Sequence, residues 1–357
     1  MIKNNLAIHI RPFKKFIKLL LTKQNNLKRT NNLIHTIINW KIFKSLKLKT
    51  YPLSMIICPG NICNLNCQLC PVGLKESGRD KGLMKFSLFK KIIDECGPYL
   101  YEIYLYNWGE PLLNKDIFKM ISYAKKFNIK TIISSNLMIF DKELKEKLVN
   151  SGLDMIIVSL DGASKKSVSK YQKGSDFEKV FGRMNEIIDF RNKERKITPL
   201  VSWRFLVNKH NENELEEARC LAKKNKIDEI CFIPMLPNMG KYVLRTEEES
   251  FGDLERWIPL EDTYSYFNKK TGKFKESNPP CNWMWLSASV NWDGSVSPCC
   301  GIWHKKFDFG DVSKDSFIKI WNNKNYANSR KIIINKKINE FNICNICKKN
   351  NKQINLF

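Results

Sequence analysis

The stretch CNLNCQLC, residues 63–70, places Cys63, Cys67 and Cys70 in a C-x3-C-x2-C pattern. Three neighbouring thiolates can hold three irons of a [4Fe–4S] cube, which leaves the fourth iron open to another ligand. An ordinary electron-transfer cluster has four cysteine ligands. A structural zinc site also has four ligands, which often come as two C-x2-C pairs. The lone triplet therefore favours an iron–sulfur cluster that touches a substrate or a cofactor.

The triplet resembles the signature of the radical S-adenosylmethionine (SAM) family. The resemblance implies that the amino and carboxylate groups of SAM chelate the open iron. One electron then cleaves SAM to a 5′-deoxyadenosyl radical, which removes a hydrogen atom from the substrate. The family usually has an aromatic residue before the last cysteine; Leu69 keeps the apolar character of that position, and we expect it to contact the cofactor.

Length and composition limit the possible classes of protein. The chain has 357 residues, enough for one large domain and a smaller one. Its 12 cysteines fall mostly into clusters, which favours metal sites over a secreted disulfide framework. No signal peptide is visible, so a cytoplasmic location is expected.

The charge is strongly positive and unevenly placed. The net charge is +25, and residues 1–75 contain no Asp or Glu. Such a charge favours anionic partners, namely nucleic acid, acidic lipid or phosphorylated substrates. The Lys-, Asn- and Ile-rich composition of the whole chain explains the same charge without any function.

Residues 1–50 are predicted to form a basic helical extension, because apolar residues recur at helical spacing with lysines largely elsewhere around the axis. Such a helix can pack against the rest of the protein or lie on a membrane surface. We expect packing, with peripheral membrane contact as the alternative. No stretch approaches the roughly 18 apolar residues that a membrane-spanning helix needs.

Strand and helix patterns alternate from residue 53 onward. Strands are predicted at 53–57, 101–106, 130–134, 155–160, 200–207 and 229–233, with helices at 87–95, 116–127, 141–150, 177–190 and 212–224. Ser87 is the expected N-cap of the first helix. Six strands separated by helices imply parallel pairing through right-handed crossovers. The family resemblance implies the same α/β class, a partial (β/α)6 TIM-like barrel over residues 51–240. Residues 241–280 are charged and irregular, which predicts a linker or a substrate-covering segment.

Polar motifs follow the predicted strands, where the active sites of such barrels gather. Gly109-Glu110-Pro111 resembles the Gly-Gly-Glu-Pro motif of the family, with Trp108 in place of the first glycine. The resemblance implies that this motif holds the amino group of SAM. An arginine on a strand can clamp a carboxylate of SAM or substrate, or it can point into solvent. An Asp-Gly pair can equally be a tight turn. The predicted cofactor-binding residues are Leu69, Gly109, Glu110, Pro111, Ser135, Asn136, Ser159, Asp161 and Arg204.

A second cysteine unit occupies residues 281–357. The spacing C-x12-G-x4-C over Cys281, Gly294 and Cys299, followed by a C-x2-C pair, resembles the SPASM/twitch extension of radical SAM enzymes. Asp293-Gly294 predicts a hairpin with a two-residue turn. The resemblance implies an auxiliary [4Fe–4S] cluster, and a four-cysteine zinc site is the alternative. The implied ligands are Cys281, Cys299, Cys344 and Cys347. Cys300 stays unassigned, and Cys58, Cys96, Cys220 and Cys231 are expected to be small buried residues.

The leading hypothesis is a radical SAM oxidoreductase whose auxiliary cluster accepts an electron from the substrate radical. This direction follows from a resemblance to twitch-bearing dehydrogenases, which implies a polyol, sugar or glycan-like small molecule as substrate. A flavodoxin or ferredoxin is the expected electron donor. A SPASM-type peptide maturase is the close alternative. A zinc-stabilised nucleic-acid-binding protein is the alternative of another class, but the Gly-Glu-Pro motif and the lone triplet argue against nucleic acid as a partner.

Overall fold

The computed structural model describes residues 19–235, 255–265, 267–268, 273–275, 281–335 and 341–349. Predictions for residues 1–18, and for much of the segment 241–280, lie outside the described residues. Within the described ranges, no helix combines the length and apolar character needed to cross a bilayer.

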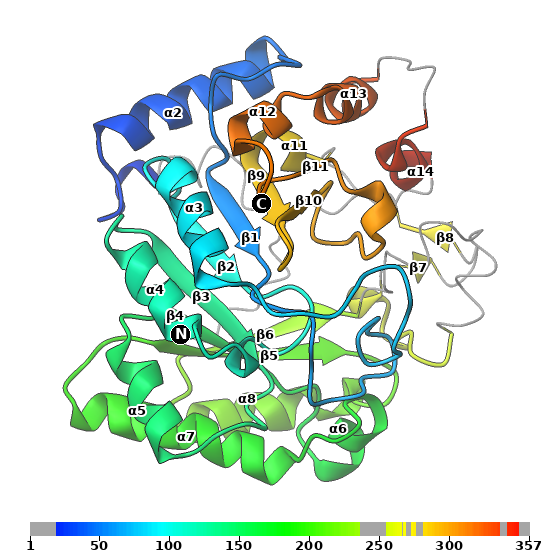
Figure 1. The fold of residues 1–357 in the computed structure, drawn as a ribbon. Coiled ribbons are helices and arrows are strands. Elements are labelled where there is room, and N and C mark those ends of the chain that lie inside the picture. The colour runs from blue at the N-terminus through cyan, green and yellow to red at the C-terminus, as the bar shows by residue number, and fades with distance from the viewer. Residues whose placement is uncertain are drawn as a thin grey trace.

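A nine-stranded sheet forms the centre of the structure, in the order β11-β10-β9-β1-β2-β3-β4-β5-β6 (Figure 1). Strands β1 to β6 pair in parallel with their sequence neighbours. Their bounds are β1 Ser54–Ile57, β2 Glu102–Leu105, β3 Lys130–Ser135, β4 Met155–Ser159, β5 Leu200–Val207 and β6 Glu229–Pro234. The sheet is open, since β11 and β6 are its edges, and the predicted α/β class with a partial barrel is confirmed.

Helices connect the parallel strands and cover the outer face of the sheet (Figure 1). Their bounds are α3 Phe86–Cys96, α4 Ile117–Lys125, α5 Lys142–Asn150, α6 Lys165–Tyr171, α7 Phe177–Lys193 and α8 Leu215–Lys224. Helix α4 shows the apolar stripe at helical spacing that such a helix buries, which consists of Ile117, Met120, Ile121 and Ala124. The prediction of Ser87 as N-cap was wrong. Helix α3 begins one residue earlier, and Lys85 precedes it without a side-chain cap, so Ser87 already lies inside the first turn.

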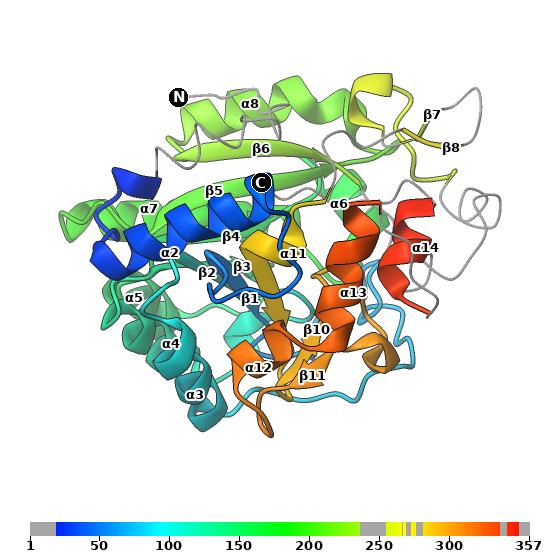
Figure 2. The same cartoon turned by 90° about the horizontal axis from the view of Figure 1, so that it is seen from above.

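The C-terminal part continues the same sheet. Strand β9 (Ser287–Val290) pairs in parallel with β1, and the short strands β10 (Ser295–Ser297) and β11 (Gly310–Asp311) follow in antiparallel pairing. Helices α11 (Trp283–Leu286), α12 (Phe317–Trp321), α13 (Lys324–Ile333) and α14 (Ile343–Lys349) complete this part. Both views place α12 and α13 beside β9–β11 (Figures 1 and 2). A two-stranded ribbon, β7 (Phe267–Asn268) with β8 (Lys273–Phe274), lies between the two parts in sequence.

The predicted hairpin at Asp293-Gly294 is present, but its turn is longer than two residues. The amide of Asn291 donates to the carbonyl of Ser295 at 2.8 Å, so residues 292–294 form the turn. Gly294 has φ +91°, which is the left-handed conformation that a three-residue hairpin turn requires.

The basic extension packs at the amino ends of the strands. Helix α2 (Leu27–Ile37) continues into a π-helix, Ile38–Ile42. Arg29 is buried and donates to the carbonyls of Gly97 at 3.1 Å and Phe127 at 2.6 Å, which follow α3 and α4. Because those helices end just before β2 and β3 begin, α2 lies at the opposite end of the sheet from the loop that follows β1 (Figure 1).

Candidate active site

The cysteine triplet lies on the loop that follows β1, at the carboxyl end of the parallel strands. Cys63, Cys67 and Cys70 are all half-buried free thiols, and Cys67 lies within electrostatic range of the other two. Burial raises the pKa of each of these thiols. Thiols in such surroundings ionise when a metal binds, because the metal replaces the proton. The three sulfurs therefore form a donor set suited to iron.

The second half of the triplet loop is held by the segment after α6. The amides of Asn66 and Gln68 donate to the carbonyls of Lys173 at 3.0 Å and Tyr171 at 3.2 Å. Leu69 is buried in a small apolar cluster with Tyr171, Met235 and Trp257. Trp257 belongs to residues 255–265, which lie inside the segment 241–280 that was predicted to be a linker or a substrate-covering segment. In the described part, this segment packs directly beside the cysteine loop.

Gly109 brings the loop after β2 into contact with the cysteine loop. It has φ +79°, and a Cβ there would lie 2.6 Å from the carbonyl oxygen of Ile62 and 2.7 Å from that of Gly60. The next residue, Glu110, donates its amide to the carbonyl of Ile62 at 2.8 Å. No side chain fits at position 109, so glycine is required for this close approach.

Glu110 joins two of the loops at this end of the sheet. Its carboxylate accepts the amide of Leu112 at 3.1 Å and that of Asn136 at 2.9 Å. Burial raises the pKa of Glu110 to about 7, against these hydrogen bonds, which lower it. Pro111 opens the short 3-10 helix that follows, Pro111–Leu113. A carboxylate has about four acceptor positions, so Glu110 can brace the loops and still accept from an ammonium group.

Asn136 connects the end of β3 to the triplet. Its amide nitrogen Nδ2 donates to Oδ1 of Asn64 at 3.0 Å and lies 3.7 Å from Sγ of Cys63. Ser135, its neighbour, uses its hydroxyl oxygen to accept the amide of Leu137 at 3.0 Å. Of these two, Asn136 faces the triplet, while Ser135 caps the turn.

Arg204 faces the interior of the barrel. Its neighbours Trp203 and Phe205 are buried, and Trp203 contacts Phe181 of α7, so the alternating Arg204 points to the other face. The guanidinium donates to the hydroxyl of Ser159 at 2.6 Å and to that of Ser134 at 2.9 Å. Its Nε is buried and has no partner among the described residues. The alternative that Arg204 points into solvent is wrong, and its free donor is placed to bind an anion.

Asp161 braces the ends of β4 and β5. Its Oδ1 accepts the amide of Leu206 at 2.9 Å, and its amide donates to Oε1 of Gln172 at 2.8 Å. Burial raises the pKa of Asp161 to about 7, while Arg204 nearby lowers it. Asp161 thus connects Arg204 electrostatically to the loop that carries Gln172.

The second group of cysteines also converges. Cys281 interacts electrostatically with Cys299, and Cys344 interacts with both. Cys299, Cys344 and Cys347 pack together around Ile302 and Ile343. Within the described residues, no three His, Cys, Asp or Glu side chains are grouped closely enough to share a single metal ion. A [4Fe–4S] cube is larger than one ion and takes four thiolates, which is the donor set present here.

Tyr106 and Cys300 lie between Arg204 and the second cysteine group. The ring of Tyr106 is 5.8 Å from the guanidinium of Arg204, and its phenol interacts electrostatically with Cys300. Cys300 in turn interacts with Cys299 and Cys281. Tyr106 is not among the predicted site residues, and Cys300 had no predicted role. Tyr106 follows β2 directly, and this position at a strand end is the signal that could have identified it.

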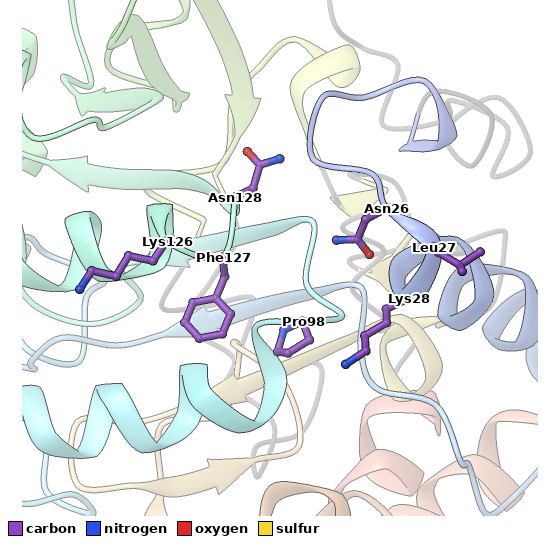
Figure 3. Close-up of a pocket in the computed structure, with 7 residues that line it drawn as sticks. All are labelled: Asn26, Leu27, Lys28, Pro98, Lys126, Phe127 and Asn128. Carbon is purple, nitrogen blue, oxygen red and sulfur yellow. The ribbon is translucent and has the colours of Figure 1, made fainter.

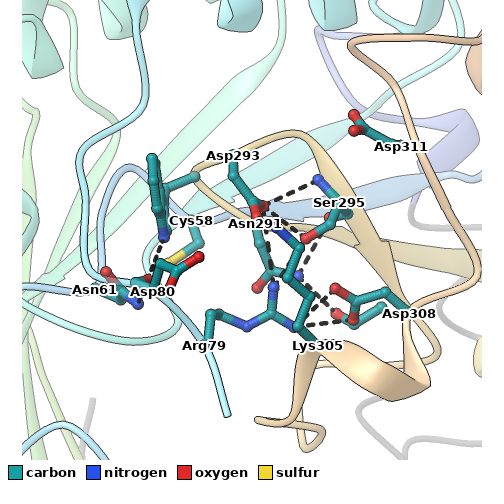
Figure 4. A network of polar contacts seen from close by, with 12 residues as sticks. Cys58, Asn61, Arg79, Asp80, Asn291, Asp293, Ser295, Lys305, Asp308 and Asp311 are labelled. Carbon is teal, nitrogen blue, oxygen red and sulfur yellow. Dashed lines mark hydrogen bonds and ion pairs between the residues drawn. The ribbon is translucent and has the colours of Figure 1, made fainter. Parts of the chain in front are cut away.

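A buried polar network connects the chain after Cys70 to the C-terminal hairpin (Figure 4). Arg79 donates two hydrogen bonds to the carboxylate of Asp308, both 2.9 Å. It also donates to the hydroxyl of Ser295 at 2.8 Å and to the carbonyl of Trp303 at 2.9 Å. Trp108, which replaces the first glycine of the expected motif, packs edge-on against Trp303 with ring centres 5.5 Å apart. These contacts therefore hold the loops around the cysteine triplet against the C-terminal part that carries the second cysteine group.

Comparison with known protein families agrees with this arrangement. A model of the radical SAM superfamily matches residues 57–222, and a model of the SPASM iron–sulfur cluster-binding domain matches residues 281–348. The chain is a radical SAM protein with a C-terminal SPASM domain. The radical SAM match contains the triplet together with Gly109, Glu110, Asn136, Asp161 and Arg204. The SPASM match contains the four converging cysteines. The alternative of a zinc-stabilised nucleic-acid-binding protein is replaced by this finding.

Relatives of this radical SAM protein have several different activities. Fe-coproporphyrin III synthase of Methanosarcina barkeri is 27% identical over 48% of this chain, and the chain spans 41% of that protein. The tungsten-containing aldehyde ferredoxin oxidoreductase cofactor-modifying protein of Pyrococcus furiosus is 24% identical over 74% of this chain and 79% of its own length. The structure of Streptococcus suis SuiB bound to S-adenosylmethionine has a TM-score of 0.59 at 16% identity, and the match covers 89% of this chain and 77% of SuiB. The SuiB likeness concerns the fold alone.

Radical SAM and SPASM domains bind [4Fe–4S] clusters and SAM, and the residues present fit these groups. The triplet provides three thiolates, and the orphaned Nε of Arg204 and the free lone pairs of Glu110 suit a carboxylate and an ammonium group.

The remaining cysteines were only partly predicted. Cys58 and Cys96 are buried as expected, but Cys231 is half-buried and Cys220 is exposed on α8, because it lies on the solvent side of that helix.

Proposed function

We propose that this radical SAM protein is an oxidoreductase that removes a hydrogen atom and then one electron from a small substrate, which also releases a proton to solvent. The cluster and SAM held by Cys63, Cys67 and Cys70 would supply the radical. Glu110 and Arg204 would orient the amino acid part of SAM or an acidic group of the substrate. Cys281, Cys299, Cys344 and Cys347 would hold the auxiliary cluster that takes the electron.

The observation that carries this proposal is the position of Tyr106 and Cys300. Both lie between Arg204, inside the barrel, and the cysteines of the SPASM domain. A substrate in the barrel would therefore be next to side chains that contact the auxiliary site. Four thiolates complete the coordination of a [4Fe–4S] cluster, so this second group suits electron acceptance better than substrate chelation.

The lining of the barrel favours a hydroxyl-rich small molecule, such as a sugar-like or polyol substrate. The hydroxyls of Ser134 and Ser159 and the guanidinium of Arg204 form one hydrogen-bonded group on adjacent strands. These groups pair well with alcohols and anions. A small electron carrier such as flavodoxin or ferredoxin is the proposed donor. Its negative charge would complement the +25 charge of this chain.

A peptide substrate is the second candidate. It is favoured by the fold likeness to SuiB, for which a structure with its precursor peptide SuiA is known. The described residues before β1 form α2 and a π-helix, and no strand among them could pair with an extended peptide. We therefore place the peptide candidate second.

Anaerobic purification and SAM cleavage test the proposal. The wild-type protein should contain about eight irons per chain and form 5′-deoxyadenosine from SAM after reduction. Cys67→Ala should abolish 5′-deoxyadenosine, whereas Cys344→Ala should lower the iron content to about four and spare SAM cleavage. Cys220→Ala is the matched control, because this exposed thiol on α8 touches neither group.

The substrate class is tested by adding panels of polyols, sugars and short peptides. Compounds of the right class should increase 5′-deoxyadenosine formation and leave a reduced auxiliary cluster that electron paramagnetic resonance detects. Loss of SAM cleavage in Cys344→Ala, with its triplet cluster intact, would contradict the assigned division of roles. Stimulation by peptides alone would replace the sugar-like substrate with the second candidate.

A further inference from the structure

Helix α2 and the segments on either side of it carry a set of exposed apolar side chains. Of the exposed large apolar residues in the described chain, a cluster falls between residues 20 and 43: Leu20, Leu21 (82% exposed), Leu27 (85%), Ile34 (46%), Ile42 (68%) and Phe43 (70%). At 100° per residue, Leu27 and Ile34 lie on one side of the α2 axis, and Ile42 lies in the π-helix that continues α2. Arg29, Leu33 and Thr36 lie on the other side and are buried. The inner face of α2 thus packs against the protein, and its outer side exposes Leu27 and Ile34 together with Lys28, Asn31 and His35.

Lysines surround this apolar face without any acidic residue. Lys23, Lys28, Lys41, Lys44, Lys47 and Lys49 are all exposed. No Asp or Glu occurs in residues 1–75, so no carboxylate of this segment neutralises them. The ammonium of Lys41 lies over the ring of Trp40, 3.8 Å from the ring centre, in a cation–π contact.

The same surface continues past the first turn of α2 into a shallow depression (Figure 3). The depression is lined by Asn26, Leu27, Lys28, Pro98, Lys126, Phe127 and Asn128. Lys126 is exposed there as well. The positive surface thus extends from α2 over the ends of α3 and α4.

We propose that this face, residues 20–49 with the adjoining Lys126, docks on an anionic lipid surface. Helices with exposed Leu, Ile and Phe between lysines bind such surfaces by inserting the apolar side chains and pairing the lysines with acidic headgroups. A nucleic-acid surface would use the lysines but leave large aliphatic side chains in water. Charge complementarity and the exposed aliphatic side chains together favour an anionic lipid surface over a nucleic acid.

The position of this face determines how the protein would be oriented on the bilayer. Helix α2 contacts the chain just before β2 and β3 begin, whereas the cysteine triplet follows the carboxyl end of β1. A bilayer on α2 would therefore lie at the far end of the sheet from the triplet. Docking holds the enzyme at the membrane while the substrate enters from the aqueous side, which argues against a substrate embedded in the bilayer.

Vesicle co-sedimentation with the full holoenzyme tests this inference. The protein should bind phosphatidylcholine vesicles that contain phosphatidylglycerol and should not bind pure phosphatidylcholine vesicles. The variant Lys28→Gln, Lys41→Gln, Lys44→Gln should bind roughly 100-fold more weakly, given the usual contribution of a lysine near an anionic surface. The matched control Lys165→Gln, Lys166→Gln, Lys170→Gln changes the same charge on exposed lysines of α6, which follows the carboxyl end of β4 and so lies at the other end of the sheet from α2. It should bind as the wild type does.

A second variant separates lipid insertion from simple charge attraction. Leu27→Gln with Phe43→Gln keeps every lysine and should weaken vesicle binding more than about tenfold, because two large side chains no longer leave water. Both variants should retain the iron content and thermal midpoint of the wild type. Vesicle binding that survives in both variants, loss in the lysine variant alone, or self-association through this face would each overturn the inference. So would the absence of binding to the anionic vesicles.

Discussion

Replacing Arg79 with methionine should destabilise the protein strongly. The Arg79 side chain is 0% exposed and makes a two-pronged ion pair with Asp308, whose side chain is 7% exposed. Removing one partner of a buried pair costs about 3–5 kcal/mol, because the other charge is left without compensation. Since a chain of this length loses roughly 2 °C in melting temperature per kcal/mol, Arg79→Met should melt about 6–10 °C lower.

A double-mutant cycle with Asp308→Asn isolates the pair. If the cost comes from the lone carboxylate, Arg79→Met with Asp308→Asn should be more stable than the sum of the single changes, by roughly 2 kcal/mol. The measurement is the anaerobic thermal midpoint of the cluster-loaded protein, at one scan rate and pH 7.5. Lys314→Met with Asp311→Asn is the matched control, because this pair is more exposed and 3.8 Å apart and should show almost no coupling. Additivity of the Arg79 and Asp308 changes within about 0.5 kcal/mol would refute the reasoning.

Three further predictions follow from the same geometry. Burial raises the pKa of Asp308 to about 6, so protonation of Asp308 stabilises the folded state at low pH, and this stabilisation is lost as the pH rises. Relative to Asp308→Asn, the free energy of unfolding of the wild type should fall by about 1.3 kcal/mol between pH 5 and pH 7. A difference between the two proteins that does not change with pH would contradict the assignment. Gly109→Ala should prevent SAM cleavage, because its Cβ meets backbone atoms within 2.8 Å, whereas Gly182→Ala in α7, with nothing within 4 Å, should stabilise the protein by about 0.5–1 kcal/mol. Arg204→Lys keeps the charge but loses the planar fork, so the KM for SAM or substrate should rise about tenfold with little change in kcat; an effect on kcat alone would exclude a binding role.

The local pattern of the sequence was enough to predict the framework. Strands of near-continuous apolar residues, such as Met155–Ser159, and helices with one apolar stripe, such as α4, depend on side chains a few residues apart. The cysteine triplet could be recognised in the sequence for the same reason, because its three sulfurs come from one short loop. Errors at this level were small shifts: α3 begins before Ser87, and the hairpin turn at Gly294 is one residue longer than predicted.

Residues that act through distant partners were not predictable in this way. Arg79 and Asp308 are 229 residues apart in sequence, and no local period connects them. Glu110 and Asp161 were predicted as cofactor contacts, but each also holds neighbouring loops together through backbone amides. That bracing role depends on which strands are neighbours in the sheet, and sequence spacing does not show it.

The sequence by itself determined the chemistry, because the ligand types and the spacing of Cys63, Cys67 and Cys70 are covalent facts of the chain. It also determined the alternation of strands and helices, since hydrophobic periods are local. Only the tertiary structure decided that β9 pairs with β1 and so joins the SPASM domain to the radical SAM sheet. It also decided that Tyr106 and Cys300 lie between Arg204 and the cysteines of the SPASM domain. Burial and long-range pairing create these relations, and they exist only once the chain has folded.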